Sequence, residues 1–257
     1  LFVLLVLLMA VCPLVGWSLN SLKKLGKRAW LPVLAALFGT AAALIWLTRS
    51  WAALLTIFIV LLGLAVLVAQ TWLELKAAPR PLKTFWRGRA RHGAWLVHAG
   101  ILLIALGIVG VEALSQSIQG TLVPGDKMPL GRYAVELTAI DEDFENPEYL
   151  SVRARLNLWR GDKIIAQINP GQDLYEIRNQ YVSIPGKRSA LTGDFYTLLL
   201  DYDPAMGYAV IQATLNPLVN FMWIGAFLLC LGAALSLSAP IAPELPDAPT
   251  EPENDAL

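Results

Sequence analysis

Long apolar runs, interrupted by short basic loops and one long polar stretch, constrain this chain most. About twenty mostly apolar residues are needed to cross the hydrocarbon core of a bilayer. Five segments of the sequence approach that length: 1–17, 29–47, 52–73, 93–114 and 217–237. Tryptophans lie near the ends of these segments, as they do in the interfacial aromatic belt of membrane proteins. The sequence therefore predicts an α-helical integral membrane protein with about five transmembrane helices.

The overall composition agrees with this prediction and excludes some functions. The chain is 56% hydrophobic and only 16% charged, which is outside the usual balance of a soluble globular domain. It carries 20 basic and 20 acidic residues, so its formal net charge is zero. Because there is no global positive field to attract a polyanion, we expect the lipid bilayer as a partner and no nucleic acid.

The distribution of lysine and arginine over the loops predicts the orientation. Basic residues are concentrated in the loops after the first and third apolar segments: Lys23, Lys24, Lys27, Arg28, Lys76, Arg80, Lys83, Arg87, Arg89 and Arg91. Such loops remain on the cytoplasmic side of the membrane. We therefore expect a multi-pass protein of a bacterial or archaeal cytoplasmic membrane, with residues 115–216 on the outer side.

The polar stretch 115–216 has the size of a small domain and the pattern of a β-structure. Apolar and polar residues alternate with period two in Val152–Leu158, and Arg160–Lys163 has the composition of a hairpin turn before Ile164–Ile168. Further strands are expected at 133–140, 175–182, 195–201 and 208–214. About six short strands predict an extracytoplasmic all-β domain, barrel-like or sandwich-like.

The predicted organisation has five parts. Residues 1–92 form three transmembrane helices with basic cytoplasmic loops, 93–114 a fourth helix, 115–216 the β-domain and 217–238 the last helix, and 239–257 form a disordered, acidic, proline-rich cytoplasmic tail. Because the sequence starts at a leucine inside an apolar run, we expect it to be a piece of a longer protein.

Only two histidines occur, His92 and His98, and both lie at the start of the fourth apolar segment. His92 follows the basic loop, where a solvated imidazole is ordinary. His98 lies about one and a half turns inside the segment, where a polar ring is expected to have a partner or a function. A neutral imidazole there can ligate haem iron, with space for the macrocycle beside Ala94, Gly100 and Ala105. The same small residues serve helix packing equally well.

Other polar candidates have ordinary explanations. Glu74 and Glu112 lie at segment ends, where a carboxylate reaches water. Two basic pairs of the β-domain, Arg153 with Arg155 and Lys187 with Arg188, either meet an anion such as a haem propionate or form a solvated strand face.

Familiar chemical motifs are missing from the sequence. The two cysteines, Cys12 and Cys230, are expected to be small buried hydrophobic residues. No phosphate-binding loop, nucleophile elbow or HExxH motif occurs, so a soluble-type active site is not predicted.

A sequence pattern beginning at the fourth apolar segment resembles the CcmF family of cytochrome c biogenesis proteins. Gly93–Gly100 (GAWLVHAG), followed by the apolar run 101–109, is similar to the late histidine-bearing helix of that family. The similarity continues through Pro124–Asp126, Tyr133, Asn146–Tyr149 and Asn216–Gly225. From about residue 93 to residue 237 the order and spacing agree, so the chain resembles a C-terminal portion of such a protein.

The resemblance implies a role in attaching haem covalently to apocytochrome c outside the cytoplasmic membrane. It implies that His98 is one axial ligand of a haem b iron, with the second ligand outside this chain. It also implies apocytochrome c, a haem chaperone and other cytochrome c maturation subunits as partners. The chain alone is not expected to catalyse haem ligation.

Some family features are absent or altered. The tryptophan-rich WWD segment and the external histidines that hold the substrate haem do not occur in the sequence. Asn216 and Asn220 stand where the family has basic residues, and Thr192-Gly193 stands where it tends to have Thr-Glu. A different function, that of a cofactor-free permease or scaffold subunit with an external β-domain, therefore remains the alternative.

Overall fold

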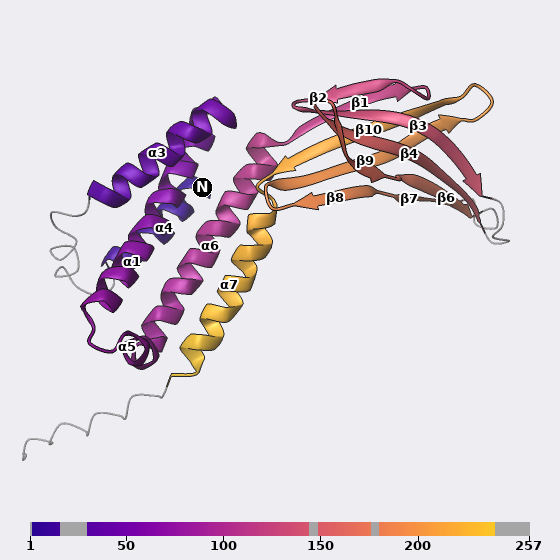
Figure 1. The fold of residues 1–257 in the computed structure, drawn as a ribbon. Helices are drawn as coiled ribbons and strands as arrows, with labels where there is room; N and C mark the ends of the chain where they lie inside the picture. The colour runs from indigo at the N-terminus through magenta and orange to yellow at the C-terminus, as the bar shows by residue number, and fades with distance from the viewer. Residues whose placement is uncertain (1, 16–29, 144–148, 176–179, 240–257) are drawn as a thin grey trace, which may run out of the picture.

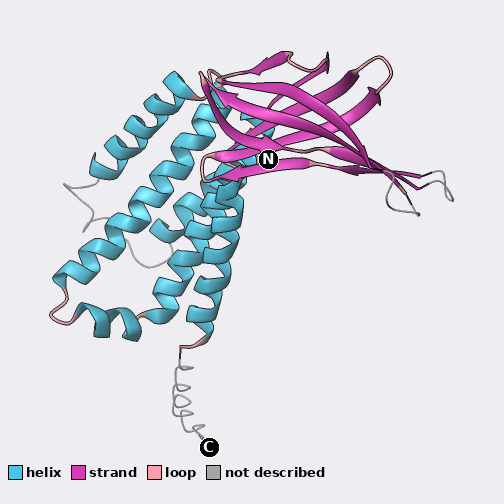
Figure 2. Ribbon diagram, turned by 45° about the vertical axis from the view of Figure 1, so that its right-hand side comes forward, coloured by secondary structure: helices cyan, strands magenta, loops and turns pink. Residues whose placement is uncertain are grey.

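The computed structural model describes residues 2–15, 30–143, 149–175 and 180–239. It contains a group of helices and a β-domain that projects from one end of them (Figures 1 and 2). The helices are α1 (Phe2–Val15), α3 (Trp30–Trp46), α4 (Trp51–Ala77), α5 (Pro81–Arg87), α6 (Arg89–Leu114) and α7 (Asn220–Leu237). The whole β-domain lies between α6 and α7 in sequence.

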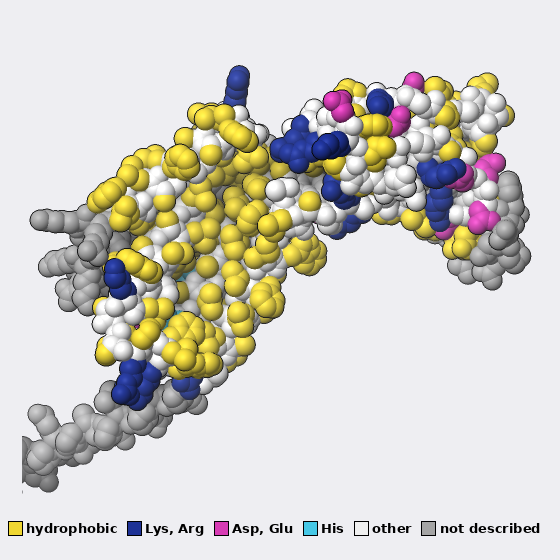
Figure 3. Space-filling model, viewed as in Figure 1, with side chains coloured by type: hydrophobic (Ala, Val, Ile, Leu, Met, Phe, Trp, Pro, Cys, Tyr) yellow, Lys and Arg dark blue, Asp and Glu magenta, His cyan; other side chains and the backbone are white. Residues whose placement is uncertain are grey.

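Three of these helices, α4, α6 and α7, are long and apolar enough to cross a membrane, whereas α3 is apolar but shorter, at 17 residues. Apolar side chains cover most of the visible helical surface (Figure 3), and many large ones are exposed, such as Phe38, Trp46 and Phe227. An apolar surface of this extent is stable in lipid rather than in water. The predicted helical membrane protein with an inserted β-domain is confirmed.

Some helix boundaries differ from the predicted ones. The basic loop after α4 contains a short helix, α5, with Pro81 at its first position, where the missing N–H costs nothing. The last helix starts at Asn220 rather than at residue 217, because strand β10 continues to Pro217. Leu218, with φ of 61°, makes the sharp turn from strand to helix. The predicted acidic tail, apart from residue 239, lies outside the described residues.

The β-domain consists of two antiparallel sheets. The first has the order β1-β10-β9-β8, and the second the order β2-β3-β4-β6-β7, with β5 also paired to β4. Their bounds are β1 (Gln116–Leu122), β2 (Lys127–Leu130), β3 (Tyr133–Asp143), β4 (Leu150–Arg160), β5 (Lys163–Ile168), β6 (Gly171–Tyr175), β7 (Gln180–Ile184), β8 (Gly186–Ala190), β9 (Gly193–Asp203) and β10 (Tyr208–Pro217).

One apolar core holds the two sheets together. Leu137 and Leu156 from the second sheet and Leu199 and Ile211 from the first are all at most 1% exposed. On β4 the buried residues alternate with more exposed ones, which is the pattern that the sequence showed. The prediction of an all-β domain with two packed layers or a barrel therefore agrees with the observed curled, two-sheet arrangement.

The sequence missed several strands of this domain. The predicted strand 175–182 is shared between two antiparallel strands, because Tyr175 belongs to β6 and residues 180–182 belong to β7, whereas 176–179 lie outside the described residues. The strands β1, β2 and β8 were not predicted. They are short or rich in polar residues, so their apolar alternation is weak, and they gain stability only from pairing with β10, β3 and β9.

Asp194 joins the β-domain to the last helix. Its carboxylate is buried and accepts hydrogen bonds from Lys187 Nζ at 2.9 Å and Asn220 Nδ2 at 2.8 Å. Burial by itself would raise the pKa of Asp194, but the hydrogen bonds from Lys187, Asn220 and Ser189 outweigh it and lower the pKa below the ordinary aspartate value. Since the folded state thereby favours the ionised carboxylate, this stabilisation is present above the unfolded-state pKa of about 3.9 and is lost as the pH falls through the folded pKa.

Replacing Asp194 with asparagine should therefore reduce stability at neutral pH and flatten its decline in acid. The loss at pH 7 is expected to be about 1–3 kcal/mol, because a buried charge-assisted hydrogen-bond network is broken. Unfolding midpoints of both proteins in detergent between pH 7 and pH 3 measure this effect. Asp141, an exposed carboxylate paired with Arg155, is the matched control, and its replacement with asparagine should change little. If the unfolding midpoints of wild type and Asp194→Asn fell by the same amount between pH 7 and pH 3, the Asp194 carboxylate would not be the source of the acid sensitivity.

Candidate functional site

Helix α6 carries both histidines, and glycines fix its orientation. A Cβ atom at Gly100 would lie 2.6 Å from the carbonyl oxygen of Gly225, and one at Gly232 would lie 2.6 Å from that of Gly93. The α6 and α7 backbones are thus in direct contact, as small residues allow in membrane helix pairs. At the basic end, Arg89 Nε donates to the carbonyl oxygen of Ser238 at 3.0 Å, which joins the start of α6 to the end of α7.

His98 lies on a different face of α6 from the glycines. It shares this face with Leu102 and Ala105, four and seven residues further along, which are buried against α1 and α4. His98 itself is only partly buried. Its Nδ1 atom is enclosed, yet it has no hydrogen-bond partner among the residues that the structure describes. An unpaired enclosed nitrogen of an imidazole in an apolar helix is available to a group from outside these residues.

The space expected for a macrocycle beside Gly100 is not there. Gly100 is buried and its open side is filled by Gly225 and Leu229 of α7. Ala105 is 4% exposed and belongs to the apolar cluster between the helices. Gly100 and Ala105 therefore serve helix packing. A flat ligand of His98 would have to approach the side of its imidazole that the described helices leave uncovered.

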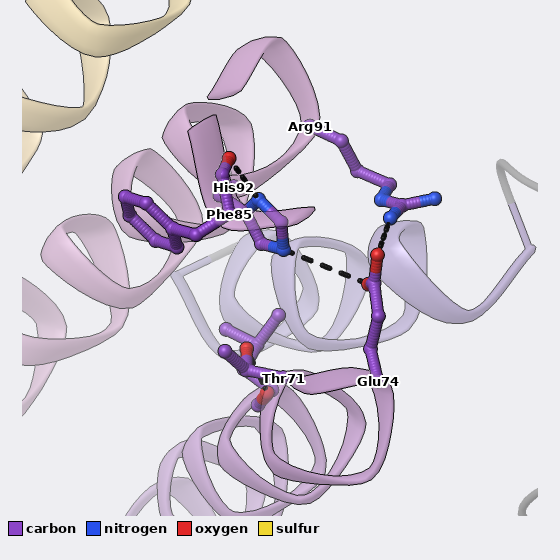
Figure 4. Close-up of polar contacts among 6 residues, drawn as sticks. Thr71, Glu74, Phe85, Arg91 and His92 are labelled. Atoms are coloured by element: carbon purple, nitrogen blue, oxygen red, sulfur yellow. Dashed lines mark hydrogen bonds and ion pairs between the residues drawn. The ribbon is translucent and has the colours of Figure 1, made fainter. Parts of the chain in front are cut away.

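His92 is not solvated as the sequence indicated. Its side chain is only 2% exposed and stacks on Phe85 of α5 with ring centroids 4.8 Å apart. Its Nδ1 lies 3.2 Å from the carbonyl oxygen of Phe85, so this nitrogen carries the proton and donates (Figure 4). The interpretation failed because α5, which the sequence did not predict, folds back over this histidine.

Glu74 also has a more specific role than a boundary carboxylate. It accepts a hydrogen bond from Arg91, and its Oε2 lies 3.6 Å from the Nε2 of His92 (Figure 4). Because Nδ1 of His92 donates to Phe85, the Nε2 of the neutral ring carries no proton and faces the Glu74 carboxylate as a second acceptor. A proton shared between Nε2 and the carboxylate would turn this contact into a hydrogen bond. The cluster fastens α4, α5 and α6 together at the basic end. Glu112, in contrast, is exposed, as expected.

The remaining candidates separate into paired and unpaired charges. Arg153 pairs with Asp173 at 2.8 Å, Arg155 with Asp141 at 2.6 Å, and Lys187 with Asp194, so these cations are neutralised within the domain. Arg188 makes no ion pair with any described residue. Cys230 is exposed on α7, contrary to the expectation of burial, because none of the described residues covers it. The side chain of Cys12 lies outside the described residues.

Comparison with known proteins extends over most of the chain. No family model matches it. It is 25% identical over 239 residues to the cytochrome c-type biogenesis protein ccl1 of Rhodobacter capsulatus, which is 91% of this chain and 35% of that protein. It is 28% identical over 213 residues to CcmF of Pseudomonas aeruginosa, covering 80% of this chain and 31% of that protein.

Two further similarities point the same way. The match to the probable cytochrome c-type biogenesis protein NrfE of Escherichia coli is 30% identical over 156 residues, covering 60% of this chain and 28% of that protein. A solved structure of the cytochrome c heme lyase CcmF superposes with a TM-score of 0.69, at 19% identity, over 91% of this chain and 38% of that one. These similarities support the interpretation that the chain is part of a CcmF-family cytochrome c biogenesis protein. The chain spans about a third of the length of its curated relatives and corresponds to a C-terminal part of them.

Within the CcmF family, the altered positions of this chain have structural explanations. Where a basic residue was expected, Asn220 donates to Asp194 and to the carbonyl oxygen of Ala190, while Lys187 supplies the charge that neutralises Asp194. Gly193 has φ of 150°, and a Cβ atom there would lie 2.6 Å from the carbonyl oxygen of Asn216. A glutamate at that position would therefore be strained in this backbone.

Proposed function

We propose that this CcmF-family protein acts in cytochrome c maturation as part of a haem lyase, which handles haem and promotes its covalent attachment to apocytochrome c. The proposal rests on family membership together with one observation, the unpaired enclosed nitrogen of His98 in a helix long enough to span the membrane. The Nδ1 of the second histidine, His92, donates to Phe85, and its enclosed Nε2 has no hydrogen-bond partner but faces the Glu74 carboxylate at 3.6 Å. His98 is therefore the candidate axial ligand of a haem b.

The chemistry of the described residues fits one axial bond. No cluster of three or more His, Cys, Asp or Glu side chains that could hold a metal ion occurs in the described part of the chain. A haem iron needs only axial ligands from the protein, because the macrocycle supplies the other four. When bound, haem b supplies reversible one-electron transfer. His98 would hold it with a neutral ring nitrogen, and the rigid α6·α7 pair would fix the position of that imidazole. The second axial ligand would come from residues outside this chain.

We further propose that the β-domain faces the outer, periplasmic side. Basic residues around α5 lie at one end of α6: Lys76, Arg80, Lys83, Arg87, Arg89 and Arg91. The β-domain lies at the other end of α6 (Figure 1). Under the positive-inside rule the basic end is cytoplasmic. Apocytochrome c, a haem chaperone and other maturation subunits would then meet the domain outside the membrane.

The function is tested by complementation in a bacterium that lacks its own CcmF. The complete gene product containing this chain should restore covalent haem in a reporter cytochrome c, measured by haem staining of denaturing gels. His98→Ala should abolish the restoration at equal protein level, while Ala113→Val, an exposed change on the same helix, should not. Failure of the wild type would oppose the lyase function, and full activity of His98→Ala would oppose the role of this histidine. A colourless protein from haem-replete cells would favour the cofactor-free scaffold.

A further inference from the structure

Three turns of the β-domain reach the end at which the chain leaves α6 and enters α7. The turn between β8 and β9 is fixed there, because the N–H of Leu218 donates to the carbonyl oxygen of Thr192 at 3.1 Å. The β2–β3 and β4–β5 turns reach the same end of the second sheet, since Tyr133 is paired with Arg160. We call this region, made of these three turns, the membrane-proximal end. If α6 and α7 cross a bilayer, it lies next to the lipid headgroups.

A small pocket that is open to solvent lies between the two sheets at the membrane-proximal end, with a cavity volume of about 40 Å³. Its apolar wall includes Leu158, Phe195 and Leu215, and two arginines, Arg132 and Arg188, also line it. A pocket this small cannot enclose a whole ligand, but it leaves room for one small polar group beside the two arginines.

The two pocket arginines lack acidic partners. No carboxylate in the described part of the chain forms an ion pair with Arg132 or Arg188, although other cations of the domain are paired. Two further basic side chains, Arg160 and Lys163, are exposed on the neighbouring β4–β5 turn. Dark blue side chains are visible in Figure 3 at the end of the domain that adjoins the helices. Unpaired guanidinium groups attract an anion, and their planar geometry suits phosphate.

Exposed apolar side chains adjoin these charges. Leu191, at the tip of the β8–β9 turn, is 67% exposed, and Trp223, on the first turn of α7, is 72% exposed. A large apolar side chain on a loop tip beside basic residues is unfavourable in water but stable at a membrane surface. Tryptophan near a helix end has the same preference.

We propose that the membrane-proximal end rests on the bilayer and that its pocket binds the headgroup of an anionic phospholipid. Arg132 and Arg188 hold the phosphate at the mouth of the pocket, the rest of the lipid stays in the bilayer, and Leu191 inserts beside it. A zwitterionic headgroup binds less well because its own ammonium group competes for the phosphate. This inference requires only that α6 and α7 cross a membrane, so it is independent of haem binding and of which side the domain faces.

The test measures lipid retained by the complete protein. Protein purified in detergent is incubated with equal amounts of phosphatidylglycerol and phosphatidylcholine, separated by gel filtration and analysed by mass spectrometry. Wild type should retain phosphatidylglycerol preferentially. The double variant Arg132→Gln/Arg188→Gln should bind phosphatidylglycerol with an affinity reduced by at least about tenfold, since two charged hydrogen-bond donors are lost. The matched control Arg155→Gln removes an exposed guanidinium of the same domain that is already paired with Asp141, and it should behave as wild type.

Three results would overturn the proposal. The first is that the double variant retains as much phosphatidylglycerol as wild type, and the second is that wild type retains the two lipids equally. The third is that inorganic phosphate at the same concentration displaces phosphatidylglycerol, which would indicate a site for free anions. The variant Arg132→Lys/Arg188→Lys keeps the charge and should recover most of the binding. Haem content, recorded on the same samples, should not change in any of these variants, so the outcome is separate from that of the His98 experiments.

Discussion

Replacement of His98 by alanine in the complete protein should eliminate the haem b absorption bands that we expect in the reduced spectrum of the wild type. His98 is the preferred candidate ligand among the described histidines, because His92 donates through Nδ1 to Phe85 and its Nε2 faces the Glu74 carboxylate at 3.6 Å. Loss of the bond from His98 would remove the one contact to iron that this chain is proposed to supply. The haem content of purified protein, normalised to protein mass, is the quantity to measure.

Two additional variants make this result specific. His98→Met should retain haem with shifted bands, because a thioether is also an axial ligand and changes the reduction potential. His92→Gln should retain unshifted bands while lowering the unfolding midpoint, since it removes the ring stacking on Phe85. Unaltered haem content in His98→Ala would refute the assignment of this ligand.

A valine at Gly100 should prevent stable association of α6 with α7. Gly100 approaches the α7 backbone so closely that even a methyl group would lie 2.6 Å from the carbonyl oxygen of Gly225 and 2.8 Å from the N–H nitrogen of Leu229. Backbone atoms cannot rotate away as a flexible side chain can, so the two helices must separate along their length. Overpacking at an ordinary core site costs about 1–3 kcal/mol, and this contact should exceed that range.

The consequence of Gly100→Val is measured by the unfolding midpoint in detergent and by the yield of folded protein. Ala113→Val adds bulk at an exposed position of the same helix and should leave both quantities close to wild type. A variant of Gly100 that is as stable as the control would show that the two helices are not held in direct backbone contact.

The candidate site was partly predictable from the sequence. A histidine inside an apolar segment is visible as an anomaly without any structure, because a polar ring in lipid needs a reason. The packing role of Gly100 was not visible, because a small residue in an apolar helix is compatible with a ligand or with another helix. The burial of His92 depends on α5, a seven-residue helix that is too short for a periodic signal. The pocket with Arg132 and Arg188 could not be predicted either. These residues are 56 positions apart in the sequence, and they come from different sheets of the β-domain.

The sequence by itself determined that this is a membrane protein with a β-domain inserted before its last helix. Apolar length and period-two alternation are local properties, and they need no knowledge of neighbours. Only the tertiary structure decided which face of each helix is occupied and which charges are neutralised. Lys187 and Asp194 are paired while Arg188, adjacent in sequence to Lys187, is not. Strand pairing and the α6·α7 contact bring residues from distant segments together, and the energy of an ion pair or a close backbone contact depends on that separation in space.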